Sequence, residues 1–301
     1  MKKILVTGSS GMVGSKFVEI FKDRYRLLTP GINKLDLTEK DAVSKYIINN
    51  KPDVIVHFAA YTDVSEAEKQ RGDRFSLCWQ VNVEGTRNLA NVIDPEQTHF
   101  IHISTDMVFS GRKDDTGPYE EAHEPENDPE KLTWYGYTKK CAENAVKAVL
   151  GDKCSILRLI YPVRTGYKKK LDPQVLGRLK MYDEGKLYPL FHDQYISITD
   201  VDEACEAILR MIEGNVFGTF HASSRDISTP YELGSYIIEK ARGKKNVVER
   251  SSFDEYVRSV GSKVRWPKYG GLKVRQTEKT LGMKFSTWKQ IIDKITGQST
   301  V

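Results

Sequence analysis

The most constraining feature of the sequence is a glycine-rich turn between a short apolar run and an amphipathic segment near its beginning. Ile4–Val6 is typical of a buried strand, and Gly8, Gly11 and Gly14 follow it at a spacing of three. In such a turn the first glycine permits the tight bend, the second lets the backbone approach a pyrophosphate, and the third lets the helix pack against the sheet. The N–H groups at the start of that helix face the anion. Strand, turn and helix in this order predict a dinucleotide-binding βα unit.

The end of the second predicted strand bears on which nicotinamide cofactor is used. An acid there normally binds the ribose 2′-OH and selects NAD. The predicted strand Arg26–Thr29 is followed by Pro30 and carries no acid at its end, and the next acid is Asp36. The sequence therefore admits NADP(H) as well as NAD(H) and leaves the preference open.

Short apolar runs alternate with longer helical patterns through the first half of the chain. Unbroken apolar strands of this kind are those that a parallel sheet buries on both faces. The alternation predicts an α/β fold, a Rossmann-type doubly wound parallel sheet with helices on both faces. We also expect a helix from Thr38, with Thr38 as its N-cap and Asp41 completing a capping box. The further strands are expected at Val54–Val56, at Phe100–Ile103 and from Ser155.

The alternation ends after Leu159, which predicts a second, smaller mixed α/β domain. Its helices have clear start signals: Asp200 with Glu203, and Thr229-Pro230 with a glutamate three residues after the threonine. We expect a dinucleotide-binding domain over residues 1–160 and a mainly substrate-binding domain over 161–301, with a strand and helix near 194–213 returning to the first domain.

A tyrosine and a lysine four residues apart, Tyr135 and Lys139, are predicted to share one face of a helix. An ammonium beside a phenol lowers the pKa of the phenol, which could then pass a proton near neutral pH. The neighbouring Tyr137 does not fit the same motif, because Cys141 and not a lysine lies four residues after it. At the carboxyl end of the fourth strand, where α/β sheets bind ligands, a hydroxyl could polarise a substrate carbonyl. We favour Thr105 over Ser104 for that role.

Composition excludes several other classes of protein. Hydrophobic residues make up 39% and charged residues 29%, and the net charge is +5, which would suit an anionic substrate. No apolar stretch is long enough for a membrane helix, and the run after Met1 is too short for a signal peptide. The four cysteines lack metal-site spacing, so we expect no metal site and a cytoplasmic protein. The basic loops Arg164–Lys170 and Arg242–Lys245 lack interleaved aromatic residues, so we expect no nucleic-acid partner.

Together these motifs resemble the extended short-chain dehydrogenase/reductases, and among them the dTDP-4-dehydrorhamnose reductases. Members of that family transfer a hydride from a reduced nicotinamide to the C4 ketone of a nucleotide-linked 6-deoxy-sugar. The segments that carry the resemblance are Leu35–Thr38, Lys51–Val64, Val81–Thr86, Ser104–Gly111, Pro118–Glu121 and Tyr135–Lys139.

The resemblance implies a role for individual residues. Thr105, Tyr135 and Lys139 would form the catalytic triad, with Tyr135 as the proton donor and Lys139 as its tuner and ribose ligand. Asp106 and Val108, together with Thr105 and Tyr135, would contact the sugar. A nucleotide-sugar substrate is implied, and a homodimer is compatible with the resemblance. The implied cofactor residues are Gly8, Ser10, Gly11, Met12, Val13, Gly14, Asp36, Leu37, Phe58, Ala59, Ala60, Tyr61, Tyr135 and Lys139.

Two departures from the family pattern weaken the assignment of rhamnose as the sugar. The segment Glu126–Trp134 before the catalytic tyrosine is longer than usual. The expected Arg-Pro-x-x-Ser-x-Leu segment is replaced by Trp266–Leu272. Both are expected where the sugar nucleotide binds.

Other functions remain open on the same motifs. An epimerase or a dehydratase could use this fold, although dehydratases usually add a glutamate beside the aspartate, where this chain has Met107 after Asp106. The regulatory subunit of methionine adenosyltransferase also resembles these reductases and can retain the tyrosine and lysine, so the motifs alone do not exclude a non-catalytic, NADP-binding protein.

Overall fold

The computed structural model describes residues 1–165, 172–261 and 265–298, and the chain divides into two compact units. Part of the basic loop Arg164–Lys170 lies outside the described residues. Unit 1 comprises Met1–Val108, Pro125–Arg158 and Cys205–Phe220, and unit 2 comprises Phe109–Glu124, Leu159–Ala204 and His221–Val301. Among the described residues, no helix combines the length and apolar character needed to cross a membrane.

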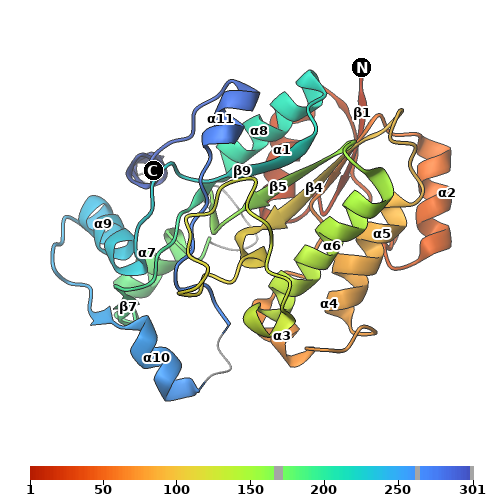
Figure 1. Ribbon diagram of the computed structural model, residues 1–301. Helices are drawn as coiled ribbons and strands as arrows, with labels where there is room; N and C mark the ends of the chain where they lie inside the picture. Colours follow the sequence, from red (N-terminus) through yellow and green to blue (C-terminus); the bar gives the residue numbers. More distant parts are fainter. Residues whose placement is uncertain (166–171, 262–264, 299–301) are drawn as a thin grey trace. The chain divides into compact units, whose positions relative to one another are not determined.

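The largest sheet among the described residues has six strands in the order β2-β1-β3-β4-β5-β9, with β9 contributed from the second half of the chain (Figure 1). β1 pairs in parallel with β2 and β3, and β3 pairs in parallel with β4. β3, β4 and β5 are buried along their whole length, as expected of the central strands of a parallel sheet that is covered on both faces. The predicted parallel α/β sheet is confirmed. The strands are β1 (Lys3–Thr7), β2 (Arg26–Leu28), β3 (Val54–His57), β4 (His99–Thr105), β5 (Cys154–Leu159) and β9 (Gly218–Ala222).

Helices cover both faces of this sheet (Figure 1). On one side α5 packs against α2 and α6. On the other side α1 and α8 lie together, and Arg24 just after α1 forms an ion pair with Glu213 in the last turn of α8. The helices are α1 (Met12–Phe21), α2 (Lys40–Asn50), α3 (Val64–Lys69), α4 (Leu77–Trp79), a π-helical turn (Gln80–Glu84), α5 (Gly85–Ala90), α6 (Trp134–Leu150) and α8 (Val201–Gly214).

The expected helix start at Thr38 is wrong. α2 begins at Lys40, and its N-cap Glu39 makes no side-chain cap hydrogen bond. The backbone N–H and the hydroxyl of Thr38 both donate to Asp36 Oδ1, at 2.9 and 2.7 Å. The carboxylate two residues earlier therefore competes successfully for the groups that would have formed the cap.

The segment predicted to return to the sheet contributes the helix α8, whose residues from Cys205 onward belong to unit 1. The strand that joins the sheet is β9, which comes after this helix. Within 194–213 the strand β8 (Thr199–Asp200) pairs instead with β6 (Pro162–Val163) in a separate two-stranded ladder.

Unit 2 is a mixed α/β unit with its own apolar core, built from side chains such as Val163, Ile198, Ile237 and Ile291. The predicted capping box at Thr229 is confirmed, with Pro230 at the first helical position. The remaining elements are β7 (Leu190–Phe191), which pairs with β10 (Arg250–Ser251), and α7 (Leu176–Asp183), α9 (Pro230–Arg242), α10 (Phe253–Val260), α11 (Arg275–Leu281) and α12 (Trp288–Gln298).

A buried ion pair connects α6 to the sheet. Arg158 of β5 donates from Nε and Nη2 to the two carboxylate oxygens of Glu143, at 3.0 and 2.7 Å, and both side chains are 1% exposed. Ser104 of β4 donates to the same carboxylate at 2.5 Å. Paired in this way, the charges are tolerated in the interior, whereas either one alone would not be.

Replacing Arg158 should therefore destabilise the protein severely. We expect Arg158→Met to lower the free energy of unfolding by about 3–5 kcal/mol, because it leaves the Glu143 carboxylate buried and unpaired. The double variant Arg158→Met/Glu143→Leu should recover much of that loss in thermal or urea denaturation. A double variant no more stable than Arg158→Met would contradict this explanation.

Candidate active site

The phosphate turn is built so that two of its glycines have no room for a side chain. Gly8 has a φ of +64°, and a Cβ there would lie 2.6 Å from the backbone nitrogen of Ala59. A Cβ on Gly14 would lie 2.5 Å from the carbonyl oxygen of Gly8, so α1 packs directly on the turn. A Cβ on Gly11 would meet only that same oxygen, at 3.3 Å. Packing within the protein thus demands glycine at Gly8 and Gly14 more strongly than at Gly11.

The start of α1 suits an anion. Its N-cap is Gly11, which has no side chain to cap the helix, and no acidic residue lies in its first turn. Helix N-termini carry partial positive charge, and here no carboxylate of the first turn competes with a ligand for it. Met12, Val13 and Gly14, all predicted to contact the cofactor, are the first three residues of this helix.

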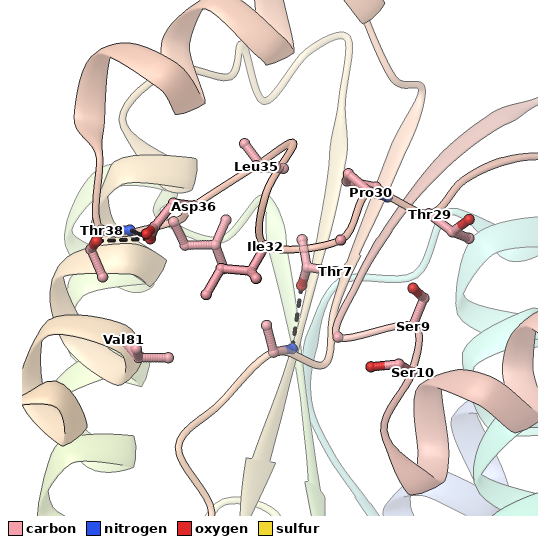
Figure 2. Close-up of a pocket in the computed structure, with 14 residues that line it drawn as sticks. Thr7, Ser9, Ser10, Thr29, Pro30, Ile32, Leu35, Asp36, Thr38 and Val81 are labelled. Atoms are coloured by element: carbon pink, nitrogen blue, oxygen red, sulfur yellow. Dashed lines mark hydrogen bonds between the residues drawn. The ribbon is translucent and has the colours of Figure 1, made fainter.

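A pocket of about 430 Å³ opens beside the same turn (Figure 2). The predicted cofactor residues Gly8, Ser10, Asp36, Leu37 and Ala59 line it. Thr29 and Pro30, which follow β2, complete it; the sequence connected these two residues with cofactor choice but did not predict them as cofactor contacts. The lining residues that were not predicted are Thr7, Ser9, Thr29, Pro30, Gly31, Ile32, Leu35, Thr38 and Val81.

Among the residues that the structure describes, Asp36 is the only ionisable side chain lining this pocket, and its Oδ1 accepts from Thr38 (Figure 2). Neither an acid that would hold a ribose diol nor a base that would neutralise a 2′-phosphate lies at the end of β2. The size and polarity of the pocket fit the adenosine half of a dinucleotide. Ser9 and Thr29 supply hydroxyls where a charged side chain would otherwise distinguish NAD from NADP.

The hydroxyls at the end of β4 have different environments. Ser104 donates to Glu143 and so belongs to the buried ion-pair cluster. Thr105 donates to Asp106 Oδ1 at 3.1 Å. Its side chain also lies close enough to Tyr135 to lower the pKa of that phenol by hydrogen bonding. The structure thus brings Thr105, Asp106 and Tyr135 together and directs Ser104 elsewhere.

Tyr135 does not have the lowered pKa that its lysine neighbour was expected to cause. Burial raises the pKa of the phenol, and the Asp106 carboxylate raises it further. Lys139 lies one turn later on α6, but its amino group bonds to β4. A phenol that stays protonated at neutral pH suits the donation of a proton to a reduced carbonyl.

Lys139 is almost completely buried, with 2% of its surface exposed. Its Nζ donates to the carbonyl oxygen of Ile103 at 2.7 Å and lies 3.1 Å from Nε2 of His102. Burial lowers the pKa of Lys139 to about 8, against the opposing effect of the Glu143 carboxylate. An ammonium has three N–H groups, so two protein contacts leave one for a ligand.

The first turn of α6 is fixed to the end of β4 by a close backbone contact. Thr133 caps the helix by accepting from the N–H of Gly136 at 3.0 Å. A Cβ on Gly136 would lie 2.0 Å from the carbonyl oxygen of Met107, so this residue must be glycine for the helix to sit where it does. The N–H of Trp134 donates to Glu68 of α3, which secures the same turn from its other side.

Asn82 holds a second part of the site together, and the sequence analysis gave it no role. In the π-helical turn, Asn82 Oδ1 accepts from the N–H of Tyr61 at 2.7 Å, and its Nδ2 donates to the Tyr61 carbonyl and to the hydroxyl of Thr138. The loop after β3, which holds the predicted cofactor residues Phe58 to Tyr61, is thereby tied to α6. Single π-helical turns are frequent at functional sites, but local periodicity does not reveal them.

Comparison with known proteins agrees with this geometry. The family model of the RmlD substrate binding domain matches residues 1–300. The chain belongs to this family. It is 30% identical over 291 residues to a probable low-salt glycan biosynthesis reductase, Agl14, of Haloferax volcanii, covering 92% of this chain and 91% of that protein.

A solved structure and a relative with a different name complete the comparison. The dTDP-4-dehydrorhamnose reductase of Bacillus anthracis, crystallised with NADP, is 25% identical with a TM-score of 0.83 and covers 99% of both chains. The methionine adenosyltransferase 2 subunit beta of Rattus norvegicus is 27% identical and covers 97% of this chain and 89% of that protein.

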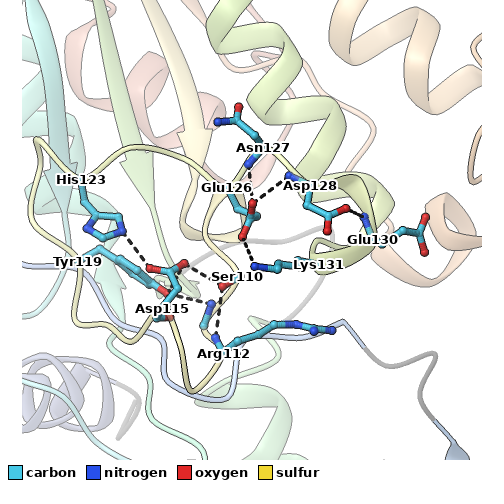
Figure 3. A network of polar contacts seen from close by, with 11 residues as sticks. Ser110, Arg112, Asp115, Tyr119, His123, Glu126, Asn127, Asp128, Glu130 and Lys131 are labelled. Atoms are coloured by element: carbon cyan, nitrogen blue, oxygen red, sulfur yellow. Dashed lines mark hydrogen bonds and ion pairs between the residues drawn. The ribbon is translucent and has the colours of Figure 1, made fainter.

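The two segments expected to depart from the family pattern are each held by local hydrogen bonds. In unit 1, Glu126 Oε1 accepts from the N–H groups of Asn127 and Asp128, while Lys131 pairs with its other oxygen (Figure 3). In unit 2, the backbone of Trp266–Leu272 bonds to loop residues such as Gly111, whose carbonyl accepts from the N–H of Tyr269. The substituted segment is thus an integral part of unit 2.

Gly136→Ala tests the contact between α6 and the end of β4. The added methyl group should force the helix away from Met107, cost about 1–3 kcal/mol of stability and remove most turnover. Gly297→Ala is the control, because a Cβ there meets nothing within 4 Å on α12. A Gly136→Ala enzyme with unchanged melting temperature and turnover would show that this approach is not required.

The raised pKa of Asp106 predicts how the stability of the protein depends on pH. Burial raises its pKa to about 7, although the hydrogen bond from Thr105 opposes the shift. Between about pH 4 and pH 7 the folded protein therefore keeps a proton that the unfolded chain releases, so the free energy of unfolding falls as the pH rises, by up to about 4 kcal/mol. Asp106→Asn should lack this loss.

The melting temperature of Asp106→Asn should consequently rise relative to that of wild type as the pH goes from about 4 to about 8. Asp41→Asn, which changes an exposed carboxylate of α2, serves as the control. A difference between Asp106→Asn and wild type that is the same at every pH would mean that Asp106 titrates normally.

Proposed function

We propose that this protein reduces the C4 ketone of a nucleotide-linked 6-deoxy-sugar with NADPH or NADH. The observation that carries the proposal is the grouping of Thr105, Asp106 and Tyr135 at the carboxyl end of β4, with Lys139 one turn further along α6. Membership of the RmlD family and the likeness to a dTDP-4-dehydrorhamnose reductase support the substrate class.

In this proposal each residue has a distinct task. The reduced nicotinamide supplies the hydride. The single hydroxyl proton of Thr105 turns from Asp106 to the carbonyl oxygen of the sugar and increases the polarisation of that carbonyl. Tyr135 then gives its phenolic proton to the same oxygen as negative charge develops there. The third N–H of Lys139 binds a ribose hydroxyl, and the pocket beside Gly8 holds the adenosine half.

The remaining assignments follow from this reaction. Asp106 and Val108 contact the sugar, and unit 2 serves mainly for substrate binding. We place the reaction in the cytoplasm, where reducing conditions suit four free cysteines.

Tyr135→Phe tests the proton donor. Removing the hydroxyl should lower turnover by at least about 10²-fold, because general acid catalysis contributes that much, while the dissociation constant for NADPH stays nearly unchanged. Tyr137→Phe removes a hydroxyl two residues away on the same helix and should keep full turnover. Lys139→Ala should weaken both cofactor binding and turnover. A Tyr135→Phe enzyme that retains its turnover would overturn the assignment.

The substrate is identified by following NADPH and NADH oxidation with a panel of freshly generated 4-keto-6-deoxy nucleotide sugars. Rapid oxidation with one of them names the sugar and the preferred cofactor together. The second candidate function is a non-catalytic regulatory subunit, favoured by the likeness to methionine adenosyltransferase 2 subunit beta. Tight NADPH binding without oxidation by any sugar would favour that candidate.

A further inference from the structure

A row of polar side chains crosses the sheet directly beside Lys139. In the strand register Thr7 is paired with His57, and His57 is paired with His102, on three neighbouring strands. Both histidines are completely buried, and their ring centroids are 5.4 Å apart. Central strands of a parallel sheet normally carry apolar residues at such positions, so a polar row here requires an explanation.

The hydrogen bonds of His57 fix its tautomer. The hydroxyl of Thr86 donates to the carbonyl of Asn82 at 2.7 Å, so its oxygen must accept from Nε2 of His57 at 2.9 Å. Nδ1 is then the acceptor and receives the hydroxyl proton of Thr7 at 2.7 Å. His57 is therefore a neutral imidazole with both nitrogens satisfied, which is the ordinary structural use of a buried histidine.

His102 is different, because only one of its nitrogens has a partner. Nε2 lies 3.1 Å from Nζ of Lys139, whereas Nδ1 has no hydrogen-bond partner among the described residues. An ammonium can only donate, so Nε2 accepts and the imidazole proton lies on the unpartnered Nδ1. A buried donor without a partner costs free energy, and an apolar residue would avoid that cost.

We propose that His102 is a positioning residue for Lys139: by accepting from the amino group, it fixes the direction of that group and favours its charged form. The inference rests on the proposed role of Lys139 as a ribose ligand. With Ile103 and His102 as acceptors, two N–H groups are fixed and the third has a defined direction. Because burial keeps His102 and His57 neutral, no second cation competes with the ammonium in this row.

Other ionisable groups also face the amino group of Lys139. Glu143, one turn later on α6 and already paired with the arginine of β5, favours the ammonium, and so would the thiol of Cys78 on α4 if it ionised. Burial of the Lys139 amino group opposes both effects, because it disfavours the charged form. Since the pKa of Lys139 lies near 8, a fall of about one unit on losing an acceptor would leave roughly half of the amine neutral near pH 7.

The test compares two amides at position 102. In His102→Gln the side-chain amide oxygen can take the place of Nε2, whereas in His102→Asn it can reach only the place of Nδ1. Both variants are polar and of similar size. His99→Leu is the control, because it removes another buried histidine of β4 whose Nδ1 also lacks a partner, and whose Nε2 bonds to Ser155.

The pKa of Lys139 is measured by NMR on the full chain labelled with ¹³Cε-lysine, with Lys139→Met identifying the signal. We expect His102→Asn to lower this pKa by about one unit and to weaken NADPH binding about tenfold, the effect of losing one hydrogen bond to a charged group. His102→Gln and His99→Leu should titrate and bind as wild type does.

An unchanged pKa in His102→Asn, or equal losses in the Gln and Asn variants, would overturn the proposal. If His102→Asn does not fold, His102→Leu also removes the acceptor, and the same fall in the pKa of Lys139 and the same loss of NADPH affinity are expected. Neither measurement requires a sugar substrate. A chain that reduces no nucleotide sugar but shows the expected shift would refute the proposed function and leave the role of His102 standing.

Discussion

The site depends above all on how closely the first turn of α6 approaches the end of β4. At Gly136 the helix backbone comes so near the carbonyl of Met107 that no side chain fits between them. This contact sets the position of Tyr135 relative to Thr105, and through the helix also that of Lys139. Because an α-helix is rigid over a single turn, one backbone contact positions both of the side chains that we propose to act in catalysis.

The features that the sequence predicted are those written in local spacing. The apolar runs predicted the strands, and the glycine spacing predicted the phosphate turn, because each signal lies within a few neighbouring residues. The pair Tyr135 and Lys139 was found in the same way, from two positions four residues apart on one helix. Resemblance to a family then supplied roles that spacing alone could not.

The sequence analysis failed where contacts join residues far apart in the chain. Asn82 is 56 residues from Thr138, and nothing in its neighbourhood shows that it ties a cofactor loop to α6. The pKa of Tyr135 was expected to fall because only its lysine neighbour was visible. Asp106 lies 29 residues earlier, and its charge combined with burial reverses the direction. The wrong expectation at Thr38 has a local cause by contrast. The carboxylates of Asp36 and Asp41 could both accept from the N–H of Thr38, and Asp36 does so.

The polar interior beside α6 shows how the fold carries chemistry at its centre. Lys139 and Glu143 lie one turn apart on the same helix, both buried, and each is supported from the sheet by a side chain of another strand: His102 from β4 and Arg158 from β5. Hydrophobic side chains of similar volume would pack there with a smaller desolvation cost. In the proposed site the acceptors of β4 favour the charged form of the Lys139 amino group and orient it, while the guanidinium of β5 pairs with the Glu143 carboxylate, and an apolar sheet could supply neither. Under the proposed function the sheet is therefore part of the active site, because it supplies the electrostatic environment of the helix that would carry the reacting groups.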